Sequence, residues 1–235
     1  MKLNILLCDS FTGLLPSYIE SYESMFYCLL DSVSSDMEYR VYDIQKGEFP
    51  EEIHTDELYL IPGSRAGAYE ETQWVKELLS FIRRAHAAQV NLIGVCFGHQ
   101  AIAQALGGKV EKSDKGWGTG IRSSKIILPE ALNYFPDGIM NLHYNHHDQV
   151  IELPKEATLF ASSDFCPNEG FVVGNHILAF QGHPEYTADY NRYVILNRAQ
   201  DEPQMVKEEA LRSLDSLSAM GQNAAKWMID LVSKK

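Results

Sequence analysis

The sequence has few cysteines and few basic side chains, and both shortages narrow what the protein can be. Its four cysteines, Cys8, Cys28, Cys96 and Cys166, lie far apart in a chain of 235 residues and form no C-x-x-C pair. This spacing lacks the usual zinc-site and disulfide-framework patterns. Isolated free thiols are typical of a reducing compartment, so we expect a cytoplasmic protein.

Basic residues are outnumbered, with 20 lysines and arginines against 32 aspartates and glutamates, which gives a formal net charge of −12. Such a surface repels phosphate backbones and anionic lipid, so we expect neither nucleic acid nor a membrane as a partner. The apolar run at residues 3–8 is too short for a signal peptide and has no small-residue cleavage site after it. We predict instead that it forms the first strand.

No segment rich in proline, glycine or serine divides the chain, and the sequence has no internal repeat. With 45% hydrophobic and 22% charged residues, its composition is typical of a globular protein. We therefore predict one domain over residues 1–235, in which residues 201–235 form a helical extension at the C-terminus.

Short aliphatic runs alternate with segments of helical spacing through the first half, which is typical of βαβ units and a parallel sheet. The predicted strands there are residues 3–8, 39–44, 57–61 and 90–95, and the predicted helices start at Pro16 and near Trp74. Closely spaced strands follow at residues 121–128, 140–144, 149–153, 158–162, 170–173 and 177–181, and helical spacing returns at 187–198 and 203–232. The sequence thus predicts an α/β fold with an open, mostly parallel central sheet flanked by helices, and a small antiparallel sheet.

One cysteine lies at the corner where a predicted strand gives way to a helix. Gly94 and Gly98 flank Cys96 two residues on either side, as in the G-x-S-x-G nucleophile elbow, where missing side chains let strand and helix approach closely. At the N-terminus of a helix, unpaired N–H groups and the macrodipole favour a thiolate. We therefore predict that Cys96 is a nucleophile; the alternative is a small buried apolar residue at a strand end.

A second motif, Gly-His-Pro-Glu at residues 182–185, follows the apolar strand at 177–181. Open α/β sheets build their sites beyond the carboxyl ends of the strands. A thiol nucleophile needs a base, and the base needs a third group that orients its ring and stabilises the imidazolium. Because an i, i+2 pair on an extended segment points the same way, His183 and Glu185 can supply both. We predict that Cys96, His183 and Glu185 form a catalytic triad.

Together the two motifs resemble those of the class I glutamine amidotransferases, whose Cys–His–Glu triad occupies them in this order. The resemblance implies a flavodoxin-like architecture, attack of Cys96 on the γ-amide carbonyl of glutamine, proton transfer by His183 and orientation of His183 by Glu185. It also implies an oxyanion hole made by the backbone N–H groups of Gly63 and Phe97. Ammonia leaves first and water then resolves a γ-glutamyl thioester, so we expect no cofactor.

A third match lies at His146, Asp148 and Val150, which are similar to the H-x-D-x-V element of the guanylate synthetase amidotransferase domain. The resemblance implies that Gln100, His146 and Asp148 bind the substrate. In an extended backbone His146 and Asp148 share one face, from which they could receive the charged end of glutamine.

The same segment admits a competing interpretation, a metal site built from His143, His146, His147 and Asp148. A zinc site requires defined geometry and a second shell of partners, neither of which follows from spacing. We predict no metal.

The loop at residues 63–69, followed by Trp74, is similar to that of the γ-glutamyl peptidases, stand-alone proteins of the same family. We therefore expect hydrolysis or transfer at the γ-carbonyl of glutamine or of a γ-glutamyl compound. The chain would either act alone or supply ammonia to a separate synthetase subunit. A hypothesis of another class is a non-enzymatic binding module or a redox sensor based on Cys96; the complete proton shuttle of His183 and Glu185 argues against both.

Overall fold

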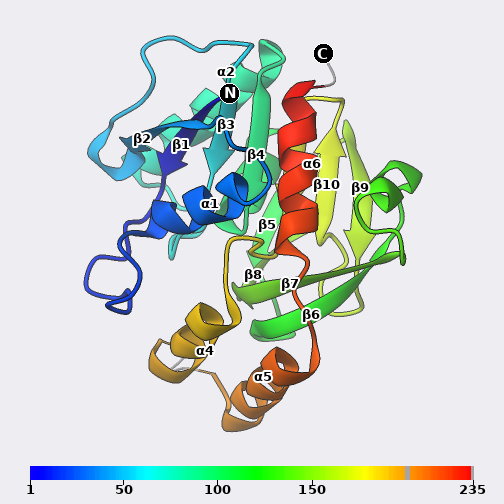
Figure 1. Cartoon of the computed structure of the whole chain (residues 1–235). Coiled ribbons are helices and arrows are strands. Elements are labelled where there is room, and N and C mark those ends of the chain that lie inside the picture. Colours follow the sequence, from blue (N-terminus) through cyan, green and yellow to red (C-terminus); the bar gives the residue numbers. More distant parts are fainter. Residues whose placement is uncertain (199–201, 234–235) are drawn as a thin grey trace.

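The computed structural model describes residues 1–198 and 202–233 (Figure 1). Within them, nine strands form one sheet in the order β2-β1-β3-β4-β11-β10-β9-β6-β7, and two more form a small antiparallel sheet, β5-β8. The strands of the large sheet are β1 (Lys2–Leu7), β2 (Glu38–Asp43), β3 (Leu58–Ile61), β4 (Asn91–Val95), β6 (Gly118–Ile126), β7 (Ile139–His146), β9 (Ala157–Ser162), β10 (Gly170–Val173) and β11 (Ile177–Phe180). Those of the small sheet are β5 (Lys109–Lys112) and β8 (Asp148–Glu152).

The large sheet has a parallel half and an antiparallel half. Strands β2, β1, β3, β4 and β11 run parallel to one another, whereas β10, β9, β6 and β7 pair antiparallel. The predicted fold class is confirmed. Strand β5 was not predicted, because only Val110 of its four residues is buried, which leaves no alternation to detect.

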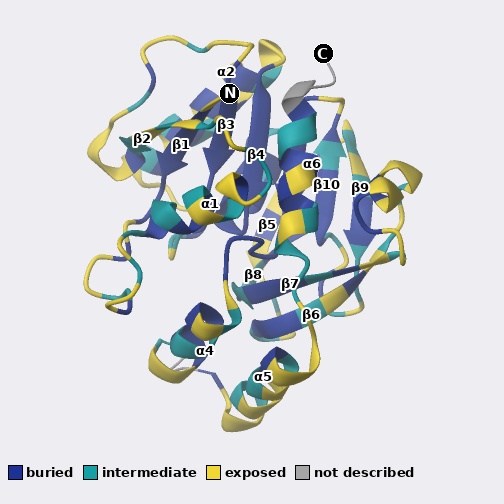
Figure 2. Ribbon diagram, in the orientation of Figure 1, coloured by how far each residue is buried: buried dark blue, intermediate teal, exposed yellow. Residues whose placement is uncertain are grey.

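Helices cover both faces of the sheet. α1 (Tyr22–Asp31) and α6 (Gly221–Ser233) pack on one face, and α2 (Gln73–Ala87) and α3 (Phe97–Ala105) pack on the other. α4 (Ala188–Asn197) and α5 (Gln204–Ser216) lie beside β6 at one end, and short 3-10 helices lie at Ile44–Lys46 and Pro129–Asn133. Figure 2 shows the central strands buried, which explains why they are continuous apolar runs in the sequence.

Helix α1 starts later than predicted. The apolar spacing suggested a start at Pro16, but Ser21 is the N-cap, and Ser21 and Ser24 form a capping box with two 3.3 Å hydrogen bonds. Tyr18, which the prediction placed in the helix, is 59% exposed. A capping box satisfies otherwise unpaired N–H groups and so sets the helix start more strongly than apolar spacing does. Tyr22 consequently becomes the first residue of α1.

The C-terminal segment folds into two helices, α5 and α6. Among its apolar residues, Ala210, Leu214, Trp227, Met228 and Leu231 are buried, whereas Val206 is partly exposed and Leu217 is 37% exposed. Asp201, Lys234 and Lys235 lie outside the described residues. The division into one domain with an extension at 201–235 stays a prediction.

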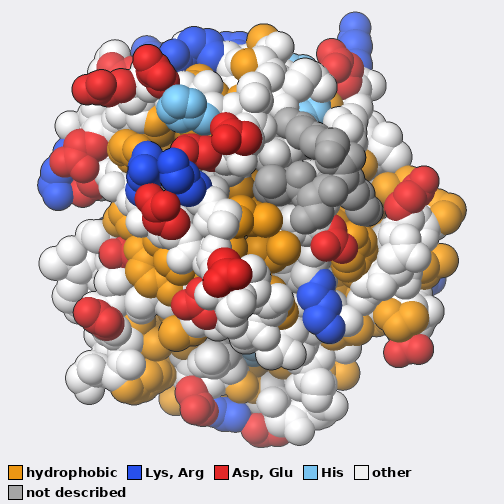
Figure 3. Space-filling view, turned by 45° about the horizontal axis from the view of Figure 1, so that its top comes forward, with side chains coloured by type: hydrophobic (Ala, Val, Ile, Leu, Met, Phe, Trp, Pro, Cys, Tyr) orange, Lys and Arg blue, Asp and Glu red, His pale blue; other side chains and the backbone are white. Residues whose placement is uncertain are grey.

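Charges of both signs are scattered over the face seen in Figure 3, with acidic side chains spread among the basic ones. In the described part of the chain, no helix is both long enough and apolar enough to cross a lipid bilayer.

Close contact between α3 and the sheet explains the glycines around Cys96. A Cβ at Gly98 would overlap the backbone of Ile61 in β3, and a Cβ at Gly94 would lie 2.7 Å from the backbone of Gly98. Real Cβ atoms do not tolerate such contacts with backbone, so only glycine fits at either position.

Replacing Gly98 by alanine should therefore lower the free energy of unfolding by more than about 3 kcal/mol, because the neighbouring backbone cannot move aside. Denaturant titration measures this loss. Gly138→Ala is the control: its methyl would meet nothing within 4 Å, and it should cost only left-handed backbone strain, about 1–2 kcal/mol. Equal losses in the two variants would contradict the close approach of α3 to β3.

Candidate active site

Cys96 lies in a strained corner between β4 and α3. Its φ is 53° and its ψ is −104°, a conformation that a residue with a side chain rarely adopts. Its backbone N–H donates to the Phe180 carbonyl at 2.8 Å, and its side chain, buried at 6% exposure, lines a pocket. The structure therefore has the predicted elbow geometry, in which the Cys96 side chain packs against the core and also lines the pocket.

His183 and Glu185 follow β11, the strand that pairs with β4. The backbone N–H of His183 donates to the His143 carbonyl at 2.7 Å, which fixes the segment against β7. The chain then turns at Pro184 instead of staying extended as predicted. The turn still brings the two side chains together: His183 Nδ1 donates to Glu185 Oε1 at 2.7 Å, with both side chains almost fully buried.

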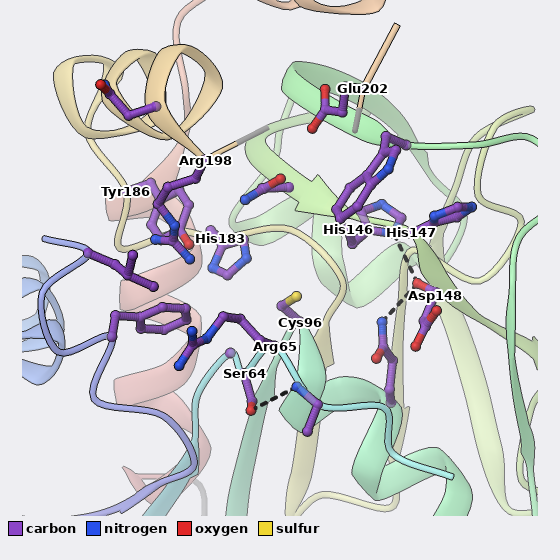
Figure 4. A pocket seen from close by; sticks show the side chains of 18 residues that line it. Ser64, Arg65, Cys96, His146, His147, Asp148, His183, Tyr186, Arg198 and Glu202 are labelled. Atoms are coloured by element: carbon purple, nitrogen blue, oxygen red, sulfur yellow. Dashed lines mark hydrogen bonds between the residues drawn. The ribbon is translucent and has the colours of Figure 1, made fainter. Parts of the chain in front are cut away.

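A pocket of about 450 Å³ lies beyond the carboxyl ends of β3, β4 and β11. Figure 4 shows Cys96 between two groups of side chains, with His183, Tyr186 and Arg198 on one side and His146, His147 and Asp148 on the other. The structure thus brings together the three predicted triad residues, two of them on the pocket wall and Glu185 behind His183.

Three buried histidines at the site differ in their pKa: that of His183 is raised, whereas those of His143 and His146 are lowered. Burial lowers the pKa of His183, but the charge of Glu185 and the interaction with the neighbouring Cys96 sulfur outweigh burial and raise it. Burial lowers the pKa of His146 to about 3, and burial together with the charge of His183 lowers the pKa of His143 to about 4. At neutral pH His183 is therefore the residue that holds a proton beside the sulfur.

The two predicted oxyanion donors are differently placed. Phe97 is the first residue of α3, where a backbone N–H has no acceptor within the helix. Gly63 lies close to the sulfur, since a Cβ built on it would be 3.8 Å from Cys96 Cβ, but its N–H donates to the Tyr22 hydroxyl at 3.2 Å. The oxyanion hole stays a prediction, in which Gly63 would have to share or release this hydrogen bond.

The three predicted substrate-binding residues all line the pocket. Gln100 Nε2 donates to the Asp148 carbonyl at 2.8 Å and to Gln181 Oε1 at 3.1 Å, so it supports the backbone of Asp148. His146 Nδ1 donates to the same carbonyl at 3.0 Å. The side chain of Asp148 is hydrogen-bonded by Tyr69 from the loop after β3.

One detail of that prediction is wrong. His146 ends β7 in the large sheet and Asp148 begins β8 in the small one, with a bend at His147 between them. They do not share a face of one extended strand. They meet at the pocket because the chain crosses from one sheet to the other at this point.

The histidine-rich segment does not converge on one point. His143 Nδ1 bonds Asn191 at 3.1 Å, His147 Nε2 donates to the Ser113 carbonyl at 3.0 Å, and His146 bonds Asp148 as above. In residues 1–198 and 202–233, no group of three or more His, Cys, Asp or Glu side chains is arranged to hold a metal ion.

Several pocket residues lie outside the recognised motifs. The Arg65 guanidinium makes a bidentate pair with Asp9 at 2.7 and 3.0 Å, which lowers the pKa of Asp9 despite its burial. Arg198 lies 4.4 Å from the Phe11 ring centroid and donates to the Tyr190 hydroxyl at 3.1 Å. Phe11 lines the pocket and Asp9 holds Arg65 from behind the pocket wall. Both follow the end of β1, so the rule that sites form at carboxyl strand ends could have found them; Arg198 had no such signal.

Comparison with protein-family models matches residues 17–200 to the family "Glutamine amidotransferase class-I". The chain belongs to the class I glutamine amidotransferase family, as its motifs predicted.

Two relatives and one solved structure show the extent of the similarity. The chain is 32% identical over 197 residues to gamma-glutamyl peptidase 3 of Arabidopsis thaliana, a match covering 80% of this chain and 78% of that protein. It is 35% identical over 178 residues to gamma-glutamyl peptidase 4 of the same plant, covering 72% and 69%. A crystal structure of a glutamine amidotransferase from Thermotoga maritima superimposes with a TM-score of 0.77 at 21% identity, covering 100% of this chain and 99% of the other, and supports the fold.

The protonation of His183 gives a prediction that does not depend on the substrate. Because its pKa is raised in the folded protein, the ring should keep its proton as the pH rises past about 6.5, the ordinary histidine value. In Glu185→Gln the main raising charge is gone while burial remains, so the ring should lose its proton at a lower pH than in the wild type. NMR titration of the His183 ring measures both; the same titration midpoint in the two proteins would show that Glu185 does not set the charge of His183.

Proposed function

We propose that this protein hydrolyses γ-glutamyl compounds through a γ-glutamyl thioester on Cys96, releasing an amine or ammonia. The observation that carries the proposal is the convergence of Cys96, His183 and Glu185 at the ends of two paired strands. The pocket in front of the sulfur, about 450 Å³ in volume, has room for a small molecule and has polar side chains on both sides. The gamma-glutamyl peptidases among the relatives support this substrate class.

The first half of the reaction forms the thioester. The Cys96 sulfur attacks the γ-carbonyl carbon, and the carbonyl oxygen takes up the electron pair of the C=O bond. When the tetrahedral intermediate collapses, the C–N bond breaks and His183 gives its proton to the leaving nitrogen. Glu185 keeps the ring oriented and stabilises its positive charge until this transfer.

The second half regenerates the enzyme. Water takes the place of the departed amine, gives a proton to His183 and attacks the thioester carbonyl. The C–S bond then breaks, which releases glutamate and restores the thiolate beside the imidazolium. Both halves of the reaction pass through an oxyanion. The Phe97 N–H is available to donate to it, and the Gly63 N–H is the second donor. One such donor typically lowers the activation free energy by about 2.7–4 kcal/mol.

The two sides of the pocket suggest how a γ-glutamyl compound lies in it. The carboxylate of Asp148 can accept hydrogen bonds from the α-ammonium group of the glutamyl part. Gln100 and His146 hold the backbone of Asp148 in place through hydrogen bonds to its carbonyl. The leaving amine would then extend toward Arg198, on the opposite side of Cys96, and toward the Phe11 ring that Arg198 contacts.

The proposal is tested by comparing hydrolysis of γ-glutamyl dipeptides with that of free glutamine. The wild type should turn over the dipeptide, and Cys96→Ala should lose kcat by about 10,000-fold or more, because removing one member of such a triad disables the whole unit. Cys28→Ala is the matched control, since this thiol is exposed and lies outside the pocket. Full activity in Cys96→Ala, or no turnover of any γ-glutamyl substrate by the wild type, would contradict the proposal.

The same assay separates the alternatives. Supply of ammonia to a synthetase would show as glutamine hydrolysis that rises strongly only when the synthetase is added. A redox sensor or binding module would bind or oxidise without turnover.

A further inference from the structure

Tyr22 lies directly beneath the triad although it belongs to neither motif. As the first residue of α1 it is held by the capping box of Ser21 and Ser24, and it is fully buried. Its ring packs edge-on against Phe11 at 4.7 Å and Phe26 at 5.9 Å between centroids. These contacts fix the ring, so the position of its hydroxyl is determined by the fold.

The hydroxyl joins the two halves of the site. It donates to Glu185 Oε1 at 3.1 Å and accepts the N–H of Gly63 at 3.2 Å. An amide N–H can only donate and an ionised carboxylate can only accept, so the hydroxyl proton must point at Glu185. The result is a chain of hydrogen bonds that runs from the Gly63 N–H through the Tyr22 hydroxyl to Glu185 Oε1. His183 Nδ1 donates to the same Oε1 at 2.7 Å.

Glu185 depends on this contact. Its Oε1 accepts both hydrogen bonds, whereas its Oε2 is buried without a hydrogen-bond partner among the described residues. A glutamate side chain has one more rotatable bond than an aspartate, so one bond to a histidine leaves the plane of the carboxylate free to turn. Burial, together with the charge of Glu185, raises the pKa of Tyr22, which keeps the hydroxyl a donor throughout the neutral range.

We propose that Tyr22 is a positioning residue, whose hydroxyl holds the Glu185 carboxylate against His183 and thereby keeps the imidazolium beside the Cys96 sulfur. The Gly63 N–H donates to this hydroxyl, so the hydroxyl proton points at Glu185. The expected effect of Tyr22 on turnover rests on the proposed function. Its expected effect on the reactivity of the Cys96 thiol does not.

The test is Tyr22→Phe, which keeps the ring and removes the hydroxyl. Turnover of a γ-glutamyl dipeptide should fall about 10- to 100-fold in kcat, the usual worth of a hydrogen bond to a charged group, with KM unchanged. The rate at which iodoacetamide alkylates Cys96 at neutral pH should fall as well. Alkylation needs the thiolate that His183 stabilises but no oxyanion hole, so it reports on the Glu185 side of the chain alone.

Tyr134→Phe is the matched control. Its hydroxyl also donates to a carboxylate, Asp230 at 2.9 Å, but it lies outside the pocket. It should leave kcat, KM and the alkylation rate unchanged. Thermal unfolding of both variants checks that each is folded under the assay conditions.

A double-mutant cycle shows whether Tyr22 acts through Glu185. In a Glu185→Ala background, Tyr22→Phe should have no further effect on the alkylation rate, because coupled residues are not additive. Additive effects, a normal alkylation rate in Tyr22→Phe, or a normal kcat would each overturn the inference. If the wild type hydrolyses no γ-glutamyl substrate, the proposed function fails, while the alkylation cycle still decides the role of Tyr22.

Discussion

The parallel pairing of β4 with β11 is the constraint on which the rest of the site depends. Its register sets Val95 opposite Phe180, and each strand leads within three residues to a predicted triad residue, Cys96 in one case and His183 in the other. The hydrogen bond from the Cys96 N–H to the Phe180 carbonyl continues the ladder to Cys96, the proposed nucleophile. Strand β3 lies on the other side of β4 and brings Gly63 to the same edge. Backbone hydrogen bonds between β3, β4 and β11 therefore bring the segments that follow these strands to one edge of the sheet, although they lie far apart in the chain.

Burial gives this arrangement its chemical character. The side chains of His183 and Glu185 are 3% and 0% exposed, so water does little to screen their attraction. Charge on Glu185 then decides the protonation of His183 against the cost of burial, whereas His143 and His146, without such a partner, remain neutral. In the proposed reaction, one protonated ring beside two neutral ones defines a single direction for proton transfer, from His183 to the leaving nitrogen.

Local sequence signals predicted the parts of the site that local structure creates. The glycines around Cys96 predicted a tight corner, and the corner exists because Gly98 lies against the backbone of Ile61. The α/β class and mostly parallel sheet followed from alternating patterns in the first half. These local signals carry no information about contacts between distant segments. Three features of the site depend on such contacts: the crossing from β7 to β8 at His147, the contact of Tyr22 with Glu185, and the position of Arg198 beside Phe11. The start of α1 was missed for a different reason, because the Ser21 cap overrode the apolar spacing that continues back to Pro16.

The most direct test of the account is to find the covalent intermediate. The protein is mixed with a γ-glutamyl dipeptide, quenched in acid within the first turnover, digested and mapped by mass spectrometry. The account predicts one γ-glutamyl group in thioester linkage on the peptide that contains Cys96. Turnover accompanied by no such adduct, or by an adduct on Cys8, Cys28 or Cys166 instead, would contradict it.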